Sequence, residues 1–208
     1  MSSNLIIPTM VHHYYLFIEK QPKDAYLVYL CKEAQRAGQT TAIFTRTISE
    51  TRRVSRLLDA LKIDTISLHC DLSPSARAAS LDKLRRKEYH AIVTTDVAAA
   101  LDPIPKVGRI INFSLTWKIN HETYAQRISN IGHAGSSGQA ISFVTQYDLD
   151  NYMCMERFLD VPFTKYNVDD DIAMSSCRGQ VEEAASEDPS LKDTDYCLVR
   201  SQRESERV

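Results

Sequence analysis

Short apolar runs and longer amphipathic segments alternate along most of the chain. Apolar, β-branched runs bounded by polar turn residues are typical of buried strands, whereas apolar residues spaced three or four apart indicate helices. We therefore predict strands at 12–18, 40–47, 65–70, 90–97, 109–115 and 139–145. We predict helices between and after them, at 24–38, 49–62, 73–87, 120–128 and 148–160.

Polar residues mark the expected starts of four of these helices. The side chains of Asp24, Ser49, Ser73 and Asn120 can each accept a hydrogen bond from an unpaired amide of the first turn. Pro74 follows Ser73 at the first helical position, where a proline is well tolerated. These residues predict where the helices begin.

Strands separated by helices indicate parallel β-α-β units. We therefore predict an α/β fold, an open parallel sheet with helices on both faces. Ligands of such sheets bind beyond the carboxyl ends of the strands. This rule directs attention to residues 45–47, 69–71, 94–97 and 113–116.

Charge is distributed unevenly along the 208 residues, although the formal net charge is only −2. Residues 166–208 hold 11 acidic and 5 basic side chains, and residues 1–165 hold 16 acidic and 20 basic ones. Low hydrophobicity and high charge predict a disordered acidic tail over 166–208, after a folded domain at 11–165. A mildly basic body is compatible with a nucleic-acid partner and does not require one.

Cysteine and histidine spacing argues against metal sites and disulfides. The five cysteines are odd in number and form no C-x-x-C pair, so we expect neither a zinc site nor a disulfide framework, and a reducing, intracellular compartment. No carboxylate or cysteine stands at ligand spacing from His12 and His13, so we predict no metal. No apolar run approaches the roughly 18 residues of a membrane span, so we expect no membrane association.

Four segments occur in a fixed order: "IFTRT", "LHCDLSPSAR", "VTTDVAAALDPIP" and "YAQRISNIGHAGSSGQAISFVT". Together, over about residues 11–160, they resemble the second RecA-like domain of DEAD-box RNA helicases. The wording of "KDAYLVYL" and "VTQYDLD" is most similar to members that serve ribosome biogenesis. The resemblance implies a monomeric RecA-like domain, a linker remnant at 1–10, and a nuclear or nucleolar location.

The resemblance also implies that single-stranded RNA is held by its phosphates, largely independently of base identity. It assigns the RNA contacts to Thr45, Arg77, Thr95 and Asp96. The family's glutamine three residues before this arginine is Pro74 here, and its glycine after the histidine is Cys70, which predicts a weakened phosphate grip. Without the resemblance, Arg77 and Thr95 would be interpreted as ordinary surface and cap residues.

The segment expected to face ATP departs further from the family pattern T-D-V-A-A-R-G-L-D-I-P. Ala100 replaces the arginine-glycine pair, and Pro103 is inserted after the aspartate. Asp102 matches the acid that faces the nucleotide ribose in relatives. Because a proline fixes φ and removes an amide donor, the direction of Asp102 stays open.

The last segment corresponds to the family pattern H-R-I-G-R-T-G-R-A-G-R-x-G, which begins here at Gln126 and Arg127. Its second and third arginines act as fingers on the γ-phosphate of ATP. Asn130 and His133 stand at these positions. Asparagine has no charge and histidine is mostly neutral near pH 7, so we expect no intact catalytic finger and weak or absent use of ATP and Mg²⁺. We interpret His133 as a tolerated loop residue rather than a compensating, pH-dependent cation.

Three functions remain open. The first is a degenerate helicase C-terminal domain that binds RNA and does not hydrolyse ATP by itself, since the family's activity also needs a first domain with G-x-x-x-x-G-K-[ST] and D-E-A-D motifs, absent from this sequence. The second is a half-enzyme, active as an RNA-dependent ATPase with a first domain supplied in trans. The third is a regulatory protein-interaction module with the acidic tail as a flexible arm.

Overall fold

The computed structural model describes residues 11–18, 23–115, 121–132 and 137–192. Its strands and helices follow one another in this order: β1 (Val11–Phe17), α1 (Lys23–Arg36), β2 (Thr41–Thr45), α2 (Ile48–Ala60), β3 (Thr65–Leu68), α3 (Pro74–Arg85), β4 (Ala91–Thr95), α4 (Asp96–Leu101), β5 (Arg109–Asn112), α5 (His121–Ser129), β6 (Gly138–Val144), α6 (Leu149–Leu159), β7 (Thr164–Lys165), α7 (Asp170–Ile172), η1 (Ala173–Cys177), α8 (Arg178–Glu187) and η2 (Pro189–Leu191). The segment η1 is a π-helical turn and η2 a 3₁₀ turn.

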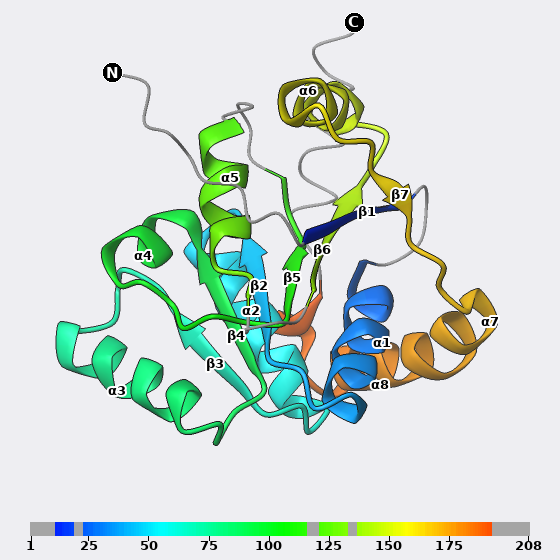
Figure 1. Cartoon of the computed structure of the whole chain (residues 1–208). Coiled ribbons are helices and arrows are strands. Elements are labelled where there is room, and N and C mark those ends of the chain that lie inside the picture. The colour runs from blue at the N-terminus through cyan, green and yellow to red at the C-terminus, as the bar shows by residue number, and fades with distance from the viewer. Residues whose placement is uncertain (1–10, 19–22, 116–120, 133–136, 193–208) are drawn as a thin grey trace, which may run out of the picture.

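The strands form one parallel sheet in the order β3-β4-β2-β5-β6-β1-β7 (Figure 1). β2 lies between β4 and β5, with Thr45 opposite Thr95 and Phe44 opposite Asn112. The carboxyl ends of these three strands therefore lie side by side. The predicted open parallel α/β sheet is confirmed.

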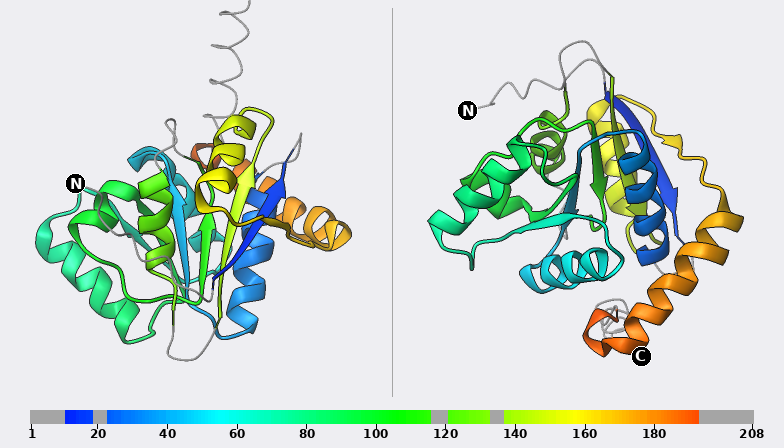
Figure 2. Two further views of the ribbon diagram at one scale, coloured as in Figure 1. Left: turned by 45° about the horizontal axis from the view of Figure 1, so that its top comes forward. Right: turned by 90° about the horizontal axis from the view of Figure 1, so that it is seen from below.

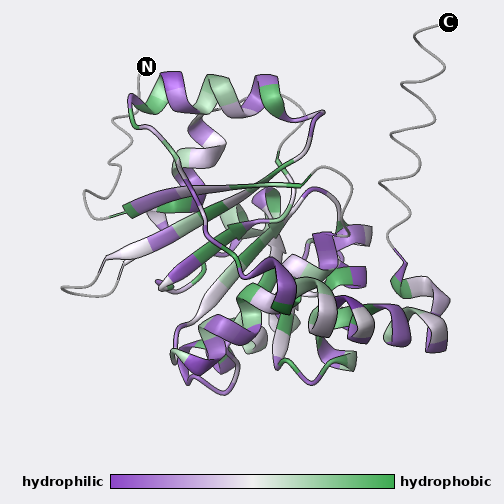
Figure 3. Cartoon of the chain, turned by 90° about the vertical axis from the view of Figure 1, so that its right-hand side faces the viewer, coloured by the Kyte–Doolittle hydropathy of each residue, from purple (hydrophilic) through white to green (hydrophobic). Residues whose placement is uncertain are grey.

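Helices cover both faces of the sheet (Figure 2). One core contains Ile43 of β2 together with residues of α1, α2 and the segment after β7. The other contains Ala42 and Phe44 of the same strand with residues of α3, α4, α5 and α6. Successive strand residues point to opposite faces, so a strand buried on both sides is apolar at nearly every position. Figure 3 shows the apolar segments of the strands in green, between helices in which apolar and polar positions alternate.

The helix starts agree only in part with the predicted caps. Ser73 is the N-cap of α3 and accepts a hydrogen bond from the Ala76 amide, with Pro74 at the first helical position, as predicted. The predicted cap Ser49 is wrong, because Thr47 caps α2. Asp24 lies in the first turn of α1 rather than at its cap, and its carboxylate pairs with an arginine of α2. Asn120 lies outside the described residues.

The strand predicted at 90–97 ends earlier than expected. β4 stops at Thr95, and α4 begins at Asp96. The Thr95 hydroxyl accepts a hydrogen bond from the Ala98 amide at 3.3 Å and caps this helix. The sharp strand-to-helix turn places Asp96 at the edge of the sheet where ligands are expected.

Gly138, the first residue of β6, fills a position where a side chain would not fit. A Cβ added there would lie 1.9 Å from Cγ2 of Ile131. Ile131 is itself buried and forms an isolated parallel bridge with Val107. This close approach anchors the segment that leaves α5 against the start of β6.

The ordered domain extends beyond the predicted boundary at residue 165. Tyr166, Ala173, Cys177, Val181 and Leu191 are buried in the core on the side of α1 and α2. The expectation that disorder begins at 166 does not hold for residues 166–192, because this acidic segment contributes an apolar stripe to the core. The remainder of the predicted tail, 193–208, and the predicted linker, 1–10, lie outside the described residues.

Candidate functional site

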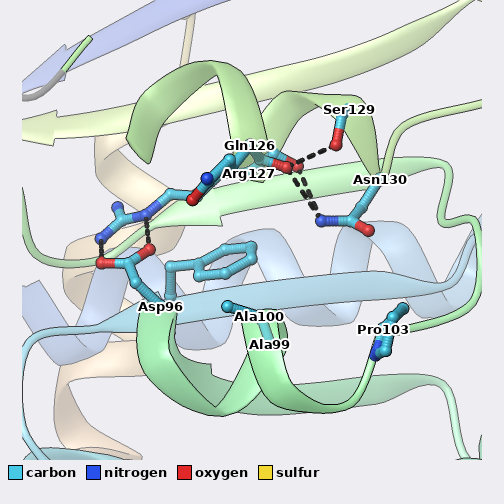
Figure 4. Close-up of a pocket in the computed structure, with 9 residues that line it drawn as sticks. Asp96, Ala99, Ala100, Pro103, Gln126, Arg127, Ser129 and Asn130 are labelled. Atoms are coloured by element: carbon cyan, nitrogen blue, oxygen red, sulfur yellow. Dashed lines mark hydrogen bonds and ion pairs between the residues drawn. The ribbon is translucent and has the colours of Figure 1, made fainter. Parts of the chain in front are cut away.

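Arg127 of α5 links the ends of the central strands. Its guanidinium donates to both carboxylate oxygens of Asp96, at 2.6 and 2.8 Å (Figure 4). Its Nη1 donates to Asn112 Oδ1 at 3.0 Å and to the Ser114 carbonyl at 3.1 Å. The guanidinium carbon lies 4.9 Å from the centroid of the Phe44 ring. Only 3% of the Arg127 side chain is exposed. This arginine therefore holds the fold together at the edge of the sheet.

Asn130 occupies the first position where the resembled family carries an arginine finger. Its Nδ2 donates to the backbone carbonyls of Gln126 and Arg127, at 3.1 and 3.2 Å (Figure 4). The amide thus closes the last turn of α5, while the Gln126 side chain is exposed. His133, at the second position, lies outside the described residues.

A pocket of about 280 Å³ lies between α4 and the end of α5 (Figure 4). Its described lining consists of Phe44, Asp96, Ala99, Ala100, Pro103, Gln126, Arg127, Ser129 and Asn130. Arg127 is the one cation in this described lining, and Asp96 already neutralises it. Binding of a phosphate is strongest where an unpaired cation can donate to its oxygens. The described lining therefore offers no unpaired cation to an anionic ligand.

Of the residues predicted to contact RNA, Thr95 and Asp96 lie at the junction of β4 and α4. Thr95 is 6% exposed, and its hydroxyl accepts one hydrogen bond, from the Ala98 amide. Asp96 is paired with Arg127, and a quarter of its side chain is exposed. Both lie at the predicted edge of the sheet.

Thr45 is fully buried. Its Oγ1 lies 2.6 Å from Thr51 Oγ1 and donates to the Thr94 carbonyl at 3.1 Å. Because its hydroxyl is buried and hydrogen-bonded within the domain, Thr45 exposes no surface to a phosphate. Thr45 is therefore not among the proposed RNA contacts.

Arg77 and Asp102, predicted to contact RNA and nucleotide respectively, pair with each other. Arg77 Nε donates to Asp102 Oδ2, and Arg77 Nη1 donates to the Leu72 carbonyl at 2.8 Å. The side chains are 14% and 28% exposed. The direction of Asp102, which the sequence left open, is therefore toward α3.

Glu50 is a residue of this edge that the sequence analysis missed. Its carboxylate accepts hydrogen bonds from the Arg46 amide and from Ser114 Oγ, both at 2.7 Å. It therefore ties the start of α2 to the end of β5. The signal was present as the T-x-x-E pattern that begins at Thr47, which is typical of a helix capping box.

His69 follows β3 and is 4% exposed. Its Nε2 accepts a hydrogen bond from Arg52 Nε at 3.4 Å, and its buried Nδ1 has no hydrogen-bond partner among the described residues. Burial, and then the neighbouring Arg52 cation, lower the pKa of His69 below its ordinary value. His69 is therefore mostly neutral near pH 7.

Metal ligands and membrane-spanning helices can be assessed for the described residues alone. None of their histidine, cysteine, aspartate and glutamate side chains gather in threes in a way that would hold a metal ion. None of their helices has the length and apolar composition needed to cross a membrane. The four cysteines among them, Cys31, Cys70, Cys154 and Cys177, are free.

Comparison with known families matches the site segments to one domain type. The profile of the helicase conserved C-terminal domain matches residues 22–135. The chain belongs to this family. It is 44% identical over 160 residues to the ATP-dependent rRNA helicase rrp3 of Aspergillus fumigatus, covering 77% of this chain and 33% of that protein. It is also 44% identical over 170 residues to rrp-3 of Neurospora crassa, covering 82% of this chain and 32% of that protein.

Resemblance of this helicase C-terminal domain to the ribosome-biogenesis members is thus confirmed, while the chain spans about a third of the length of these relatives. Solved structures agree on the fold. The Escherichia coli DEAD-box protein SrmB, bound to the regulator RraA, matches with a TM-score of 0.70 and 22% identity over 78% of this chain and 94% of that one. The C-terminal domain of the DEAD-box protein Dbp5 matches with a TM-score of 0.66 and 23% identity over 86% and 98%. The predicted RecA-like fold is confirmed.

Proposed function

We propose that this helicase C-terminal domain binds the RNA backbone and cannot supply the charged fingers that ATP hydrolysis needs. The observation that carries the proposal is the site at the end of α5. There Arg127 forms a bidentate ion pair with Asp96, and the side-chain amide of Asn130 donates hydrogen bonds to backbone carbonyls of its own helix. Neither side chain directs an unpaired positive charge toward the pocket.

The magnitude of this loss is large. An arginine finger contributes roughly 10³–10⁵ to the rate of phosphoryl transfer, which corresponds to about 4–7 kcal/mol of transition-state stabilisation. Neutral side chains at both Asn130 and His133 would leave negligible hydrolysis, even with ATP and Mg²⁺ bound to a first domain. Use of ATP by this chain is therefore weak or absent in our proposal.

RNA is the proposed ligand of the edge formed by α3 and α4. Arg77, Thr95 and Asp96 are the side chains that we assign to it, with Arg77 as the cation that meets a phosphate. Contacts to phosphate carry no base information, so the RNA would be single-stranded and bound without sequence preference. The names of the fungal relatives support ribosomal RNA as the target and a nuclear or nucleolar setting.

Salt-dependent binding to a labelled single-stranded RNA, measured by fluorescence anisotropy, tests this proposal. Binding should weaken steeply between 50 and 200 mM salt, because counterions are released from the phosphates. Arg77→Ala should weaken it further, and should make it less dependent on salt. Arg85→Ala, at the far end of the same helix, is the matched control and should change the affinity by less than about twofold, because its ion pair is solvated.

A regulatory protein-interaction module is the second candidate, and one surface favours it. Leu149 and Met153 of α6 are 42% and 45% exposed, and their spacing of four residues places them on one face of the helix. Exposed apolar side chains that share a face are typical of protein-binding surfaces. If no RNA binding is detected at 50 mM salt, this candidate replaces the first. The half-enzyme active in trans is tested separately by phosphate release, as described below.

A further inference from the structure

The ion pair between Arg77 and Asp102 joins two residues that the family resemblance assigned to different ligands. We propose that Asp102 is the internal counter-ion of Arg77 and limits how strongly this arginine binds an RNA phosphate, so that its carboxylate governs RNA affinity instead of facing a nucleotide ribose. This inference rests on the proposed binding of RNA at this edge. It assigns Asp102 a regulatory, positioning role.

The backbone around Asp102 fixes where its carboxylate points. Asp102 is the C-cap of α4, and its amide donates to the Ala98 carbonyl at 3.0 Å. Pro103 follows, and its ring restricts the chain directly after the cap. The carboxylate is therefore delivered by the end of a capped helix rather than by a freely moving loop.

Arg77 is held from two sides. Its Nε donates to the Asp102 carboxylate, and its Nη1 donates to the carbonyl of Leu72, which lies in the turn that leads into α3. Only 14% of the Arg77 side chain is exposed. A phosphate must either accept from the remaining donors beside a carboxylate or displace that carboxylate.

The charge of Asp102 opposes phosphate binding in both cases. Carboxylates and phosphates both bind guanidinium groups through the same charge-assisted hydrogen bonds, so they compete for one cation. The pair has no net charge, and the approaching phosphate is repelled by Asp102. The pair is also shielded from solvent more than Arg85–Asp82 of the same helix, whose side chains are 55% and 56% exposed. Neutralising Asp102 should therefore release Arg77 for RNA.

Anisotropy titrations of a labelled single-stranded RNA at 50 mM salt test the inference in the full chain. Asp102→Asn should tighten binding by about three- to tenfold, the range expected when a partly buried ion pair is removed. The gain should disappear when Arg77→Ala is also present. Asp82→Asn removes the same charge from α3, the helix of Arg77, where Asp82 pairs with Arg85. This control should change the affinity by less than about twofold. Asp102→Ser is the second variant, in case the asparagine perturbs the cap, and thermal unfolding checks that each variant is folded.

The outcomes separate this inference from the proposed function. If the unmodified chain binds RNA and neither Asp102 variant tightens binding, the inference is overturned and the proposed function stands. A gain that persists with Arg77→Ala, or that Asp82→Asn reproduces, would reflect overall charge and also overturn it. If RNA binds only to the Asp102 variants, and only with Arg77 present, the inference is supported. If no variant binds RNA, the inference and the proposed function fall together.

Discussion

Arg127 and Asn130 are three residues apart, yet only the Arg127 side chain forms hydrogen bonds to residues outside α5. Arg127 satisfies Asp96, Asn112 and the Ser114 carbonyl from a position that is 3% exposed. Among the described residues, the Asn130 side chain donates hydrogen bonds only to backbone carbonyls of its own helix. An arginine that binds the interior cannot reach a ligand, and an asparagine in place of an arginine brings no charge to one.

Replacing Arg127 should therefore destabilise the domain rather than a ligand complex. Arg127→Ala removes one partner of a largely buried ion pair and is expected to lower the free energy of unfolding by about 2–4 kcal/mol. The lower part of this range allows for hydration of Asp96, whose side chain is 25% exposed. Urea denaturation followed by circular dichroism measures the loss.

The matched control is Arg85→Ala, whose partner Asp82 lies on the same exposed helix surface. An exposed pair contributes at most about 1 kcal/mol, so this variant should behave almost like the unmodified chain. Equal losses for Arg127→Ala and Arg85→Ala would show that Arg127 does not hold the strand ends together.

Residue-level predictions from the sequence succeeded where a role depends on local pattern. Ser73 as the cap of α3 follows from the residue types around it. The pairing of Arg77 with Asp102 could not be predicted, because it depends on where α4 ends and where α3 begins. Burial of Thr45 was missed for a similar reason, since only the packed structure shows that Thr51 lies against it.

At the scale of elements, apolar periodicity predicted the body well and two segments poorly. The strands β2, β4 and β6 are short, largely apolar runs that are buried on both faces. Such runs are typical of the central strands of a parallel sheet. α4 was missed because its six residues are too few to show a helical repeat, and the predicted strand at 90–97 included the first two of them. The segment from Tyr166 was assigned to the tail because it is rich in charged residues, and the few apolar residues that enter the core are widely spaced among them.

The packing of this segment predicts which thiols react. Cys177 and Cys31 are each 3% exposed, and burial raises the pKa of both, that of Cys31 to about 12. At pH 8 both thiols should be protonated and shielded, so a thiol reagent should label exposed Cys154 at least tenfold faster. Peptide mapping by mass spectrometry after timed labelling measures the three rates.

A variant of α8 tests the same packing from the other side. Val181→Asp places a charge among the buried residues around Cys177, and should speed labelling of Cys177 at least tenfold. Glu182→Gln changes the next residue, whose side chain is 63% exposed, and should leave the rate unchanged. Labelling of Cys177 as fast as Cys154 in the unmodified chain would mean that the segment is not packed on α1.

At the scale of the whole molecule, one sheet brings together residues that are distant in sequence. Parallel strands with their carboxyl ends at one edge place Asp96, Asn112 and Arg127 in a single hydrogen-bonded network. The sheet and its helices are those of a helicase C-terminal domain. The described pocket beside that network contains no unpaired positive charge.

RNA-stimulated phosphate release tests this central claim most directly. The chain is mixed with the first RecA-like domain of a related DEAD-box helicase, saturating single-stranded RNA, ATP and Mg²⁺. We predict a rate no higher than that of the first domain by itself. The double variant Asn130→Arg, His133→Arg should raise the rate by at least tenfold, whereas Asn130→Gln, His133→Gln, which changes the same two residues without adding charge, should not. Robust RNA-stimulated release by the unmodified chain would contradict the claim that these two positions disable hydrolysis.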